Sequence, residues 1–379
     1  MKYTVSKKAD DKIAKDIEAI KGIILKSFSP KAIILFGGFG HGGGSFREIG
    51  GKIIPLNDYD FYLITEKKIK DKELENLGEE CSRAIGKGGL EIVERYDEKW
   101  DKDKFFHVDI HTVTEKRLKK LYPTQRTADL KTSMVIYGDE KILDKIPEIK
   151  ISKSDAIRLL FNKLNHFAIA ETNSEMLKSI YAVKGFTDSC SALLIYYGGY
   201  VSTYQERVKK LRLLKQIPKE YINLVEEATK AKLYRGYSIK NIDEFFEKSK
   251  KWVEWVLKKI IKEHLEIKSD DWKSISKIIY KKLPYIYFND YLGSRYLFLG
   301  QYYLNFKFFL AGLRKREFLT KSLVRWRDAG IIIAIALMLY SFNEKTEAGK
   351  YLGKLTGKTY PLKERILKLY SIYYLQKLV

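Results

Sequence analysis

The stretch AIILFGGFGHGGGSFREIGGKIIPLNDYDFYLIT, residues 32–65, decides the fold of this chain. Its first five residues are apolar and mostly β-branched, which predicts a short strand that stops at Gly37 and Gly38. Residues 37–51 hold eight of the chain's 25 glycines and predict a loop. Residues 58–65 then alternate in polarity and predict a second strand. A strand, a glycine-rich loop and a strand therefore form the centre of the predicted fold.

The neighbouring segments extend this centre to an α+β domain. Isoleucines recur at helical spacing within residues 4–27, and a second helix is predicted at 70–85. Two more strands are predicted at 90–95 and 105–113. The order of helices and strands is typical of a mixed sheet with helices against it.

The pattern changes after residue 150. Pro147 and the polar residues 151–155 provide a linker and a candidate helix N-cap. Long stretches with helical spacing of apolar residues follow, with hardly any strand signal. The sequence therefore predicts a sheet domain at 1–150 and a mostly α-helical domain at 151–379.

Charge is distributed unequally between these two predicted domains. The chain has 379 residues and a formal charge of +23. Residues 1–150 carry 29 Lys+Arg and 26 Asp+Glu, a net charge of +3, so residues 151–379 carry +20. Such asymmetry favours a polyanionic partner such as nucleic acid. A lysine-rich surface that only keeps the protein in solution explains the same numbers.

Composition also argues against a membrane protein and against a disulfide-rich secreted protein. The longest apolar run, residues 331–342, is shorter than the roughly 18 residues that predict a membrane span. The two cysteines, Cys81 and Cys190, are far apart, which does not suggest a disulfide framework. We therefore expect a cytoplasmic protein without a membrane segment. The sequence does not indicate an oligomeric state.

Three aspartates on predicted strands carry the candidate chemistry. Asp58 and Asp60 are two residues apart, so both carboxylates project from one face of their strand. Asp109 lies in a later strand, where Val108 and Ile110 face the opposite side. Carboxylates on neighbouring strands suit Mg²⁺ or Mn²⁺, which also accept phosphate oxygens as ligands. We predict that the three aspartates bind one or two such ions.

The glycine turn supplies the second half of the candidate site. Gly37 and Gly38 allow backbone N–H groups to approach phosphate oxygens closely. A metal site beside a phosphate-binding turn predicts phosphoryl or nucleotidyl transfer. In a two-metal scheme, one ion between Asp58 and Asp60 holds the triphosphate. The other ion, which also contacts Asp109, lowers the pKa of the attacking hydroxyl.

A strand, a glycine pair, a D-x-D strand and a later strand aspartate resemble the nucleotidyltransferase superfamily of DNA polymerase β. The matching residues are Gly37, Gly38, Asp58, Asp60 and Asp109. The resemblance covers residues 31–113 and is looser over 135–139 and the helices to about residue 215. It is strongest to a prokaryotic group with a helical C-terminal domain.

The resemblance implies one more residue and leaves two departures. Many members place a helix lysine against the triphosphate, which implies this role for Lys184; the alternative is a lysine that only extends along an apolar helix towards solvent. Gly38 and Asp58 are 20 positions apart, which is longer than usual, so the loop has an insertion or a substrate-binding segment. His41 and Gly43 replace an arginine and a glutamate that relatives often have.

Two weaker signals complete the prediction of sites. His107 and His111 flank Asp109 with a period of two and are either metal ligands or polar residues that line an acidic cleft. Basic residues at 313–318 and 322–328 are candidates for a surface that binds RNA phosphates.

These observations predict an enzyme. It transfers a nucleoside monophosphate from a nucleoside triphosphate such as ATP to a hydroxyl and releases pyrophosphate, and we expect an RNA end as the acceptor. One alternative is transfer to a small molecule or a protein side chain. Another is a catalytically silent relative that binds nucleic acid or regulates a partner.

Overall fold

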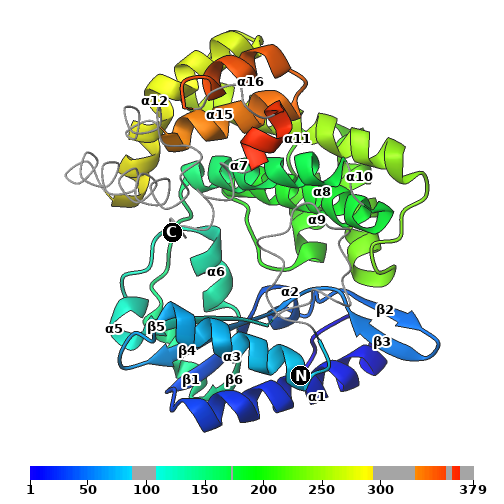
Figure 1. The fold of residues 1–379 in the computed structure, drawn as a ribbon, viewed down its shortest axis with the longest axis vertical. Coiled ribbons are helices and arrows are strands. Elements are labelled where there is room, and N and C mark those ends of the chain that lie inside the picture. Colours follow the sequence, from blue (N-terminus) through cyan, green and yellow to red (C-terminus); the bar gives the residue numbers. More distant parts are fainter. Residues whose placement is uncertain (88–107, 172–173, 293–328, 356–360, 368–379) are drawn as a thin grey trace. The chain divides into compact units, whose positions relative to one another are not determined.

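The computed structural model describes residues 1–87, 108–171, 174–292, 329–355 and 361–367 (Figure 1). Contacts divide the chain into two compact units. The first unit comprises Met1–Ile151, Ser174–Val183 and Gly198–Asn241. The second comprises Ser152–Asn173, Lys184–Tyr197 and Ile242–Val379. The contacts thus change near the predicted boundary at residue 150, but two later segments belong to the first unit.

A four-stranded mixed sheet forms the centre of the first unit. Its strands are β1 (Ala32–Phe36), β4 (Tyr59–Thr65), β5 (Val108–Thr114) and β6 (Met134–Gly138), in the order β5-β4-β1-β6. β4 and β5 are parallel, whereas β1 is antiparallel to β4 and β6. The predicted α+β class is confirmed. The strand predicted at 90–95 lies outside the described residues.

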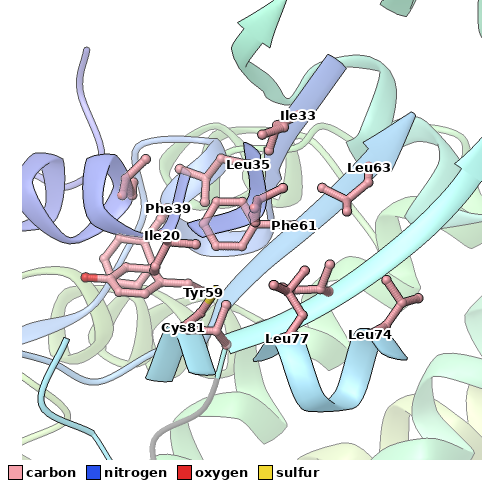
Figure 2. Close-up of a cluster of buried hydrophobic side chains, with 14 of the residues drawn as sticks. Ile20, Ile33, Leu35, Phe39, Tyr59, Phe61, Leu63, Leu74, Leu77 and Cys81 are labelled. Carbon is pink, nitrogen blue, oxygen red and sulfur yellow. The ribbon is translucent and has the colours of Figure 1, made fainter. Parts of the chain in front are cut away.

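One face of this sheet packs against two helices, α1 (Lys7–Ser27) and α3 (Asp71–Ala84). Alternate residues of β1 and β4 point to this face because successive side chains of a strand face opposite ways. Figure 2 shows the resulting cluster, in which the helices and strands contribute Ile20, Ile33, Leu35, Tyr59, Phe61, Leu63, Leu74, Leu77 and Cys81. Burial of these side chains fixes the register that positions the polar residues of β4.

The opposite face packs against short helical segments. They are α5 (Glu115–Leu118), α6 (Gln125–Lys131) and the 3₁₀ helix η2 (Glu140–Lys145). The buried residues on this side are Ala32, Ile34, Ile64, Val113, Leu118, Leu130, Val135, Ile142 and Ile146. The sheet is therefore covered on both faces, and Asp60 and Asp109 are the second residues of β4 and β5.

The glycine-rich segment is more ordered than the loop that its composition predicts. It starts with the short helix α2 (Gly37–Gly40) and continues into a hairpin of β2 (Phe46–Ile49) and β3 (Lys52–Pro55). Gly50 and Gly51 form the turn with φ of +53° and +78°. Two adjacent glycines supply the left-handed backbone that tight hairpins need. The extra length between Gly38 and Asp58 is thus partly a two-stranded insertion.

Helices form the rest of the described chain. α9 (Tyr204–Arg212) and α10 (Lys219–Tyr234) belong to the first unit. α8 (Glu175–Tyr197) begins in the first unit and ends in the second. The second unit also contains α7 (Lys153–Ala170), α11 (Ile242–Leu265), α12 (Trp272–Leu292), α15 (Ala329–Ser341) and α16 (Lys345–Leu352). Among the described residues, no helix combines the length and apolar character that crossing a membrane requires.

Candidate active site

Two of the predicted aspartates lie next to each other in the sheet. Asp60 of β4 and Asp109 of β5 are direct partners in the parallel register. Both side chains are partly buried, and the residues before and after each of them are buried in the sheet core. Neighbouring strands are about 4.8 Å apart, so the two carboxylates share one face of the sheet at close range.

Asp58 lies one residue before β4, in a segment held by side-chain hydrogen bonds. Asn57 Oδ1 accepts a hydrogen bond from the Ser45 backbone N–H at 2.8 Å. Asn57 Nδ2 donates to Tyr237 Oη at 3.3 Å. Lys232 Nζ donates to the same hydroxyl at 3.0 Å. The hairpin and α10 thus fix the backbone that precedes Asp58.

The donor chemistry of the aspartate pair fits a hard divalent ion. Mg²⁺ is commonly bound by one or two carboxylates, with water and substrate phosphates as the other ligands. Asp60 and Asp109 supply that number of carboxylates. Within the described residues, no group of three or more His, Cys, Asp and Glu side chains is arranged to hold a metal ion. The convergence of all three aspartates on shared ions therefore stays a prediction.

The glycine turn lies directly against Asp60. Gly37 has φ of +69°, and a Cβ atom added there would lie 2.7 Å from Asp60 Oδ2. A Cβ at Gly38 would lie 3.3 Å from the Gly43 carbonyl oxygen. Only glycine therefore combines this backbone conformation with this approach to the carboxylate. The predicted phosphate-binding turn and one predicted metal ligand are in van der Waals contact.

His41 connects the glycine turn to α6. Its Nδ1 lies 2.9 Å from the Gly37 carbonyl oxygen, and its Nε2 lies 3.0 Å from the Asp129 carbonyl oxygen. Its ring also packs edge-on against Phe36, with centroids 6.4 Å apart. His41 therefore has a structural role, because its ring links the Gly37 turn to α6.

An aromatic group beside the aspartate pair was not part of the predicted site. Tyr62 packs against Phe36 and His111, at centroid separations of 5.5 and 5.2 Å. The guanidinium carbon of Arg126 lies 5.2 Å from the Tyr62 ring centroid and 5.6 Å from that of Phe36. Burial raises the pKa of Tyr62, and the charges of Asp60 and Asp109 add to this, whereas Arg126 opposes it. Arg126 thus brings a positive charge close to the acidic pair.

The positions of Tyr62 and His111 beside the aspartates could have been predicted from the sequence, whereas that of Arg126 could not. Tyr62 follows Asp60 by two residues, and His111 follows Asp109 by two, so the strand period places each pair on one face. His111 Nε2 lies 3.2 Å from Asp109 Oδ2, and its role as a metal ligand or as a polar neighbour of the aspartates stays a prediction. His107 lies outside the described residues. Arg126 is far from these strands in sequence, and no pattern in the sequence identifies it.

Lys184 lies on the part of α8 that belongs to the second unit. Lys163 Nζ pairs with Asp188 Oδ2 at 3.0 Å across α7 and α8. Burial lowers the pKa of His166 well below its ordinary value, and the charges of Lys163 and Lys184 contribute. The contact of Lys184 with a triphosphate stays a prediction.

A comparison of the chain with protein-family models and with curated proteins finds no match.

Proposed function

We propose that this protein is a metal-dependent nucleotidyltransferase. It transfers a nucleoside monophosphate from a nucleoside triphosphate to a hydroxyl group and releases pyrophosphate. The observation that carries this proposal is the register pair of Asp60 and Asp109 with the Gly37 turn packed against Asp60. The two carboxylates, which suit a hard cation, come from β4 and β5, and the glycine turn, which suits phosphate, follows β1.

Each group of the proposed site has a separate role in the reaction. Asp60 and Asp109, with Asp58, would hold Mg²⁺ or Mn²⁺, which when bound neutralises phosphate charge and acidifies the attacking hydroxyl. The backbone N–H groups of the Gly37 turn bind phosphate oxygens. Arg126 provides a fixed positive charge for the phosphates that leave. Its stacking on Tyr62 orients the guanidinium before substrate binds.

We propose Lys184 as a second cation for the triphosphate. The support for this role is the resemblance to the nucleotidyltransferase superfamily, many members of which place a helix lysine against the triphosphate. Replacing Lys184 by alanine is expected to raise the KM for the nucleotide with a smaller effect on kcat. Lys178 on the same helix is a matched control. Equal KM values for the wild type and the Lys184→Ala variant would exclude the assignment.

The proposed acceptor is the end of an RNA molecule. The charge of +20 on residues 151–379 supports a polyanionic partner. The basic tracts at 313–318 and 322–328 lie outside the described residues, so their part in RNA binding stays a prediction.

The test is a transfer assay with matched aspartate variants. The protein is incubated with each α-labelled nucleoside triphosphate, Mg²⁺ or Mn²⁺, and cellular RNA, and labelled products are separated. Asp60→Asn and Asp109→Asn keep side-chain shape and remove charge, so transfer should fall by orders of magnitude. Asp11→Asn, at an exposed position on α1, controls for a general charge effect.

Three outcomes distinguish the possibilities. A labelled RNA that disappears in the two site variants supports the whole proposal. A labelled protein or small molecule supports the chemistry and replaces the acceptor. Wild-type activity in both site variants, with the same unfolding midpoint, would reject the metal site.

A further inference from the structure

A basic hollow lies at the end of β5 away from the aspartate pair. It has a volume of about 370 Å³ and is lined by Thr114, Lys116, Arg117, Lys120 and Tyr122. All five residues belong to one segment of the first unit, from the last residue of β5 through α5 to the following turn. Three of the five lining side chains are cationic, so the hollow has the charge of an anion site.

The only acidic residue in this segment is already neutralised. Glu115 forms ion pairs with Lys31, at 2.7 Å, and with Lys145. Hydrogen bonds from these lysines lower the pKa of Glu115 to about 2, so it is ionised and paired at neutral pH. In the part of the chain that the structure describes, Lys116, Arg117 and Lys120 form no ion pair. Their charges are exposed and available to a ligand.

Tyr122 gives the hollow a second kind of contact. Its side chain is 37% exposed, one of the few exposed large aromatic side chains among the described residues. An exposed aromatic ring beside cations can stack a nucleic-acid base while the cations contact the backbone. The Thr114 hydroxyl can donate to a phosphate oxygen in the same hollow.

We propose that the Thr114–Tyr122 hollow binds single-stranded RNA. Lys116, Arg117 and Lys120 contact backbone phosphates, and Tyr122 stacks on an unpaired base. Thr114 lies five residues beyond Asp109 on one strand, which is roughly 17 Å at 3.3 Å per residue. The binding itself does not depend on nucleotidyl transfer. If the proposed function is right, the hollow would hold the RNA at about this separation along β5 from the aspartates.

The sequence places a matched control beside the hollow. Lys119 and Lys120 are adjacent exposed lysines, and only Lys120 lines the hollow. Lys119→Glu and Lys120→Glu therefore change the total charge equally. The test is to measure binding of a fluorescently labelled single-stranded oligouridylate to the full chain by anisotropy, without nucleotide or metal.

The expected loss follows from counterion release. Each neutralised phosphate of a single strand contributes a salt exponent of about 0.7, which corresponds to about eightfold in affinity at 50 mM salt. Lys120→Glu should weaken binding by about this factor and flatten the salt dependence by about 0.7. Lys119→Glu should weaken it less than twofold. Tyr122→Ala should weaken it about fivefold or more, and Tyr122→Phe should not.

Other outcomes overturn the inference. Equal losses for Lys119→Glu and Lys120→Glu would mean that total charge, and not the hollow, attracts RNA. Tighter binding of duplex RNA than of single strands would exclude base stacking on Tyr122. Complete displacement by millimolar inorganic phosphate would assign the hollow to a small anion. The binding assay contains no nucleotide and no metal, so failure of this inference is separable from failure of the transfer assay.

Discussion

Replacing Gly37 by alanine tests whether the glycine turn and Asp60 act as one site. An added Cβ atom at Gly37 would lie 2.7 Å from Asp60 Oδ2, whereas ordinary contacts begin at 3.4 Å. Backbone elsewhere in the sheet holds Gly37 in place, so the carboxylate must move by about 0.7 Å. A misplacement of about 1 Å can cost about a hundredfold in rate. We therefore expect transfer to fall by about 10- to 100-fold.

Backbone strain contributes to this variant independently of the carboxylate. An L-residue in the left-handed region costs about 1–2 kcal/mol. Gly51 has φ of +78° and no atom within 4 Å of its hypothetical Cβ, so Gly51→Ala has the strain without the clash. Gly51→Ala should lose this strain energy in a denaturant titration, and Gly37→Ala should lose at least as much, because the displaced carboxylate adds to it. Only Gly37→Ala should lose transfer activity.

The assay compares kcat for nucleotide transfer at a temperature where both variants are folded. A third variant combines Gly37→Ala with Asp60→Asn. Once the carboxylate charge is gone, moving the side chain should cause little further loss, so the two effects should not add. Wild-type kcat in Gly37→Ala, or an equal loss in Gly51→Ala, would refute a functional contact between the turn and Asp60.

Three further predictions concern stability and reactivity. Phe61→Ala should cost about 3–5 kcal/mol of unfolding free energy in urea titrations, because Phe61 is fully buried in the sheet core. Burial raises the pKa of Cys81 to about 12, so iodoacetamide at pH 8 should label it, by peptide mapping, only after unfolding. Lys145 and Lys31 lower the pKa of Glu115 to about 2. The stability difference between wild type and Glu115→Gln should therefore be complete above about pH 4.5 and vanish as the pH falls through about 2.

The parts of the fold that were predicted from the sequence are those with a local periodic signal. β1 and β4 are short apolar or alternating runs whose pattern reflects burial directly. The β2–β3 hairpin was missed because its segment is rich in glycine and reads as a loop. The adjacent Gly50 and Gly51 between two short extended runs are a hairpin signal that could have identified it.

The site depends on information that periodicity does not contain. Asp60 and Asp109 each have a local signal, but their direct pairing follows from the parallel register of two strands 49 residues apart. Arg126 reaches Tyr62 only because α6 packs on that face of the sheet. The sequence predicts α9 and α10 as part of the helical domain at 151–379, but they belong to the first unit. Helical periodicity shows that one face of a helix is buried, but not which surface covers that face.

Net charge is a weaker guide to a partner than the position of each charge. Lys232 adds to the +20 of residues 151–379, but its side chain is almost fully buried. Its Nζ lies 4.8 Å from the Tyr204 ring centroid and donates to Tyr237 Oη at 3.0 Å. Through Tyr237 and Asn57, this lysine supports the backbone before Asp58 instead of attracting a polyanion. The three exposed lining cations of the Thr114–Tyr122 hollow belong to the half of the chain with a net charge of only +3, so a local group of exposed cations can lie where the charge total gives no signal.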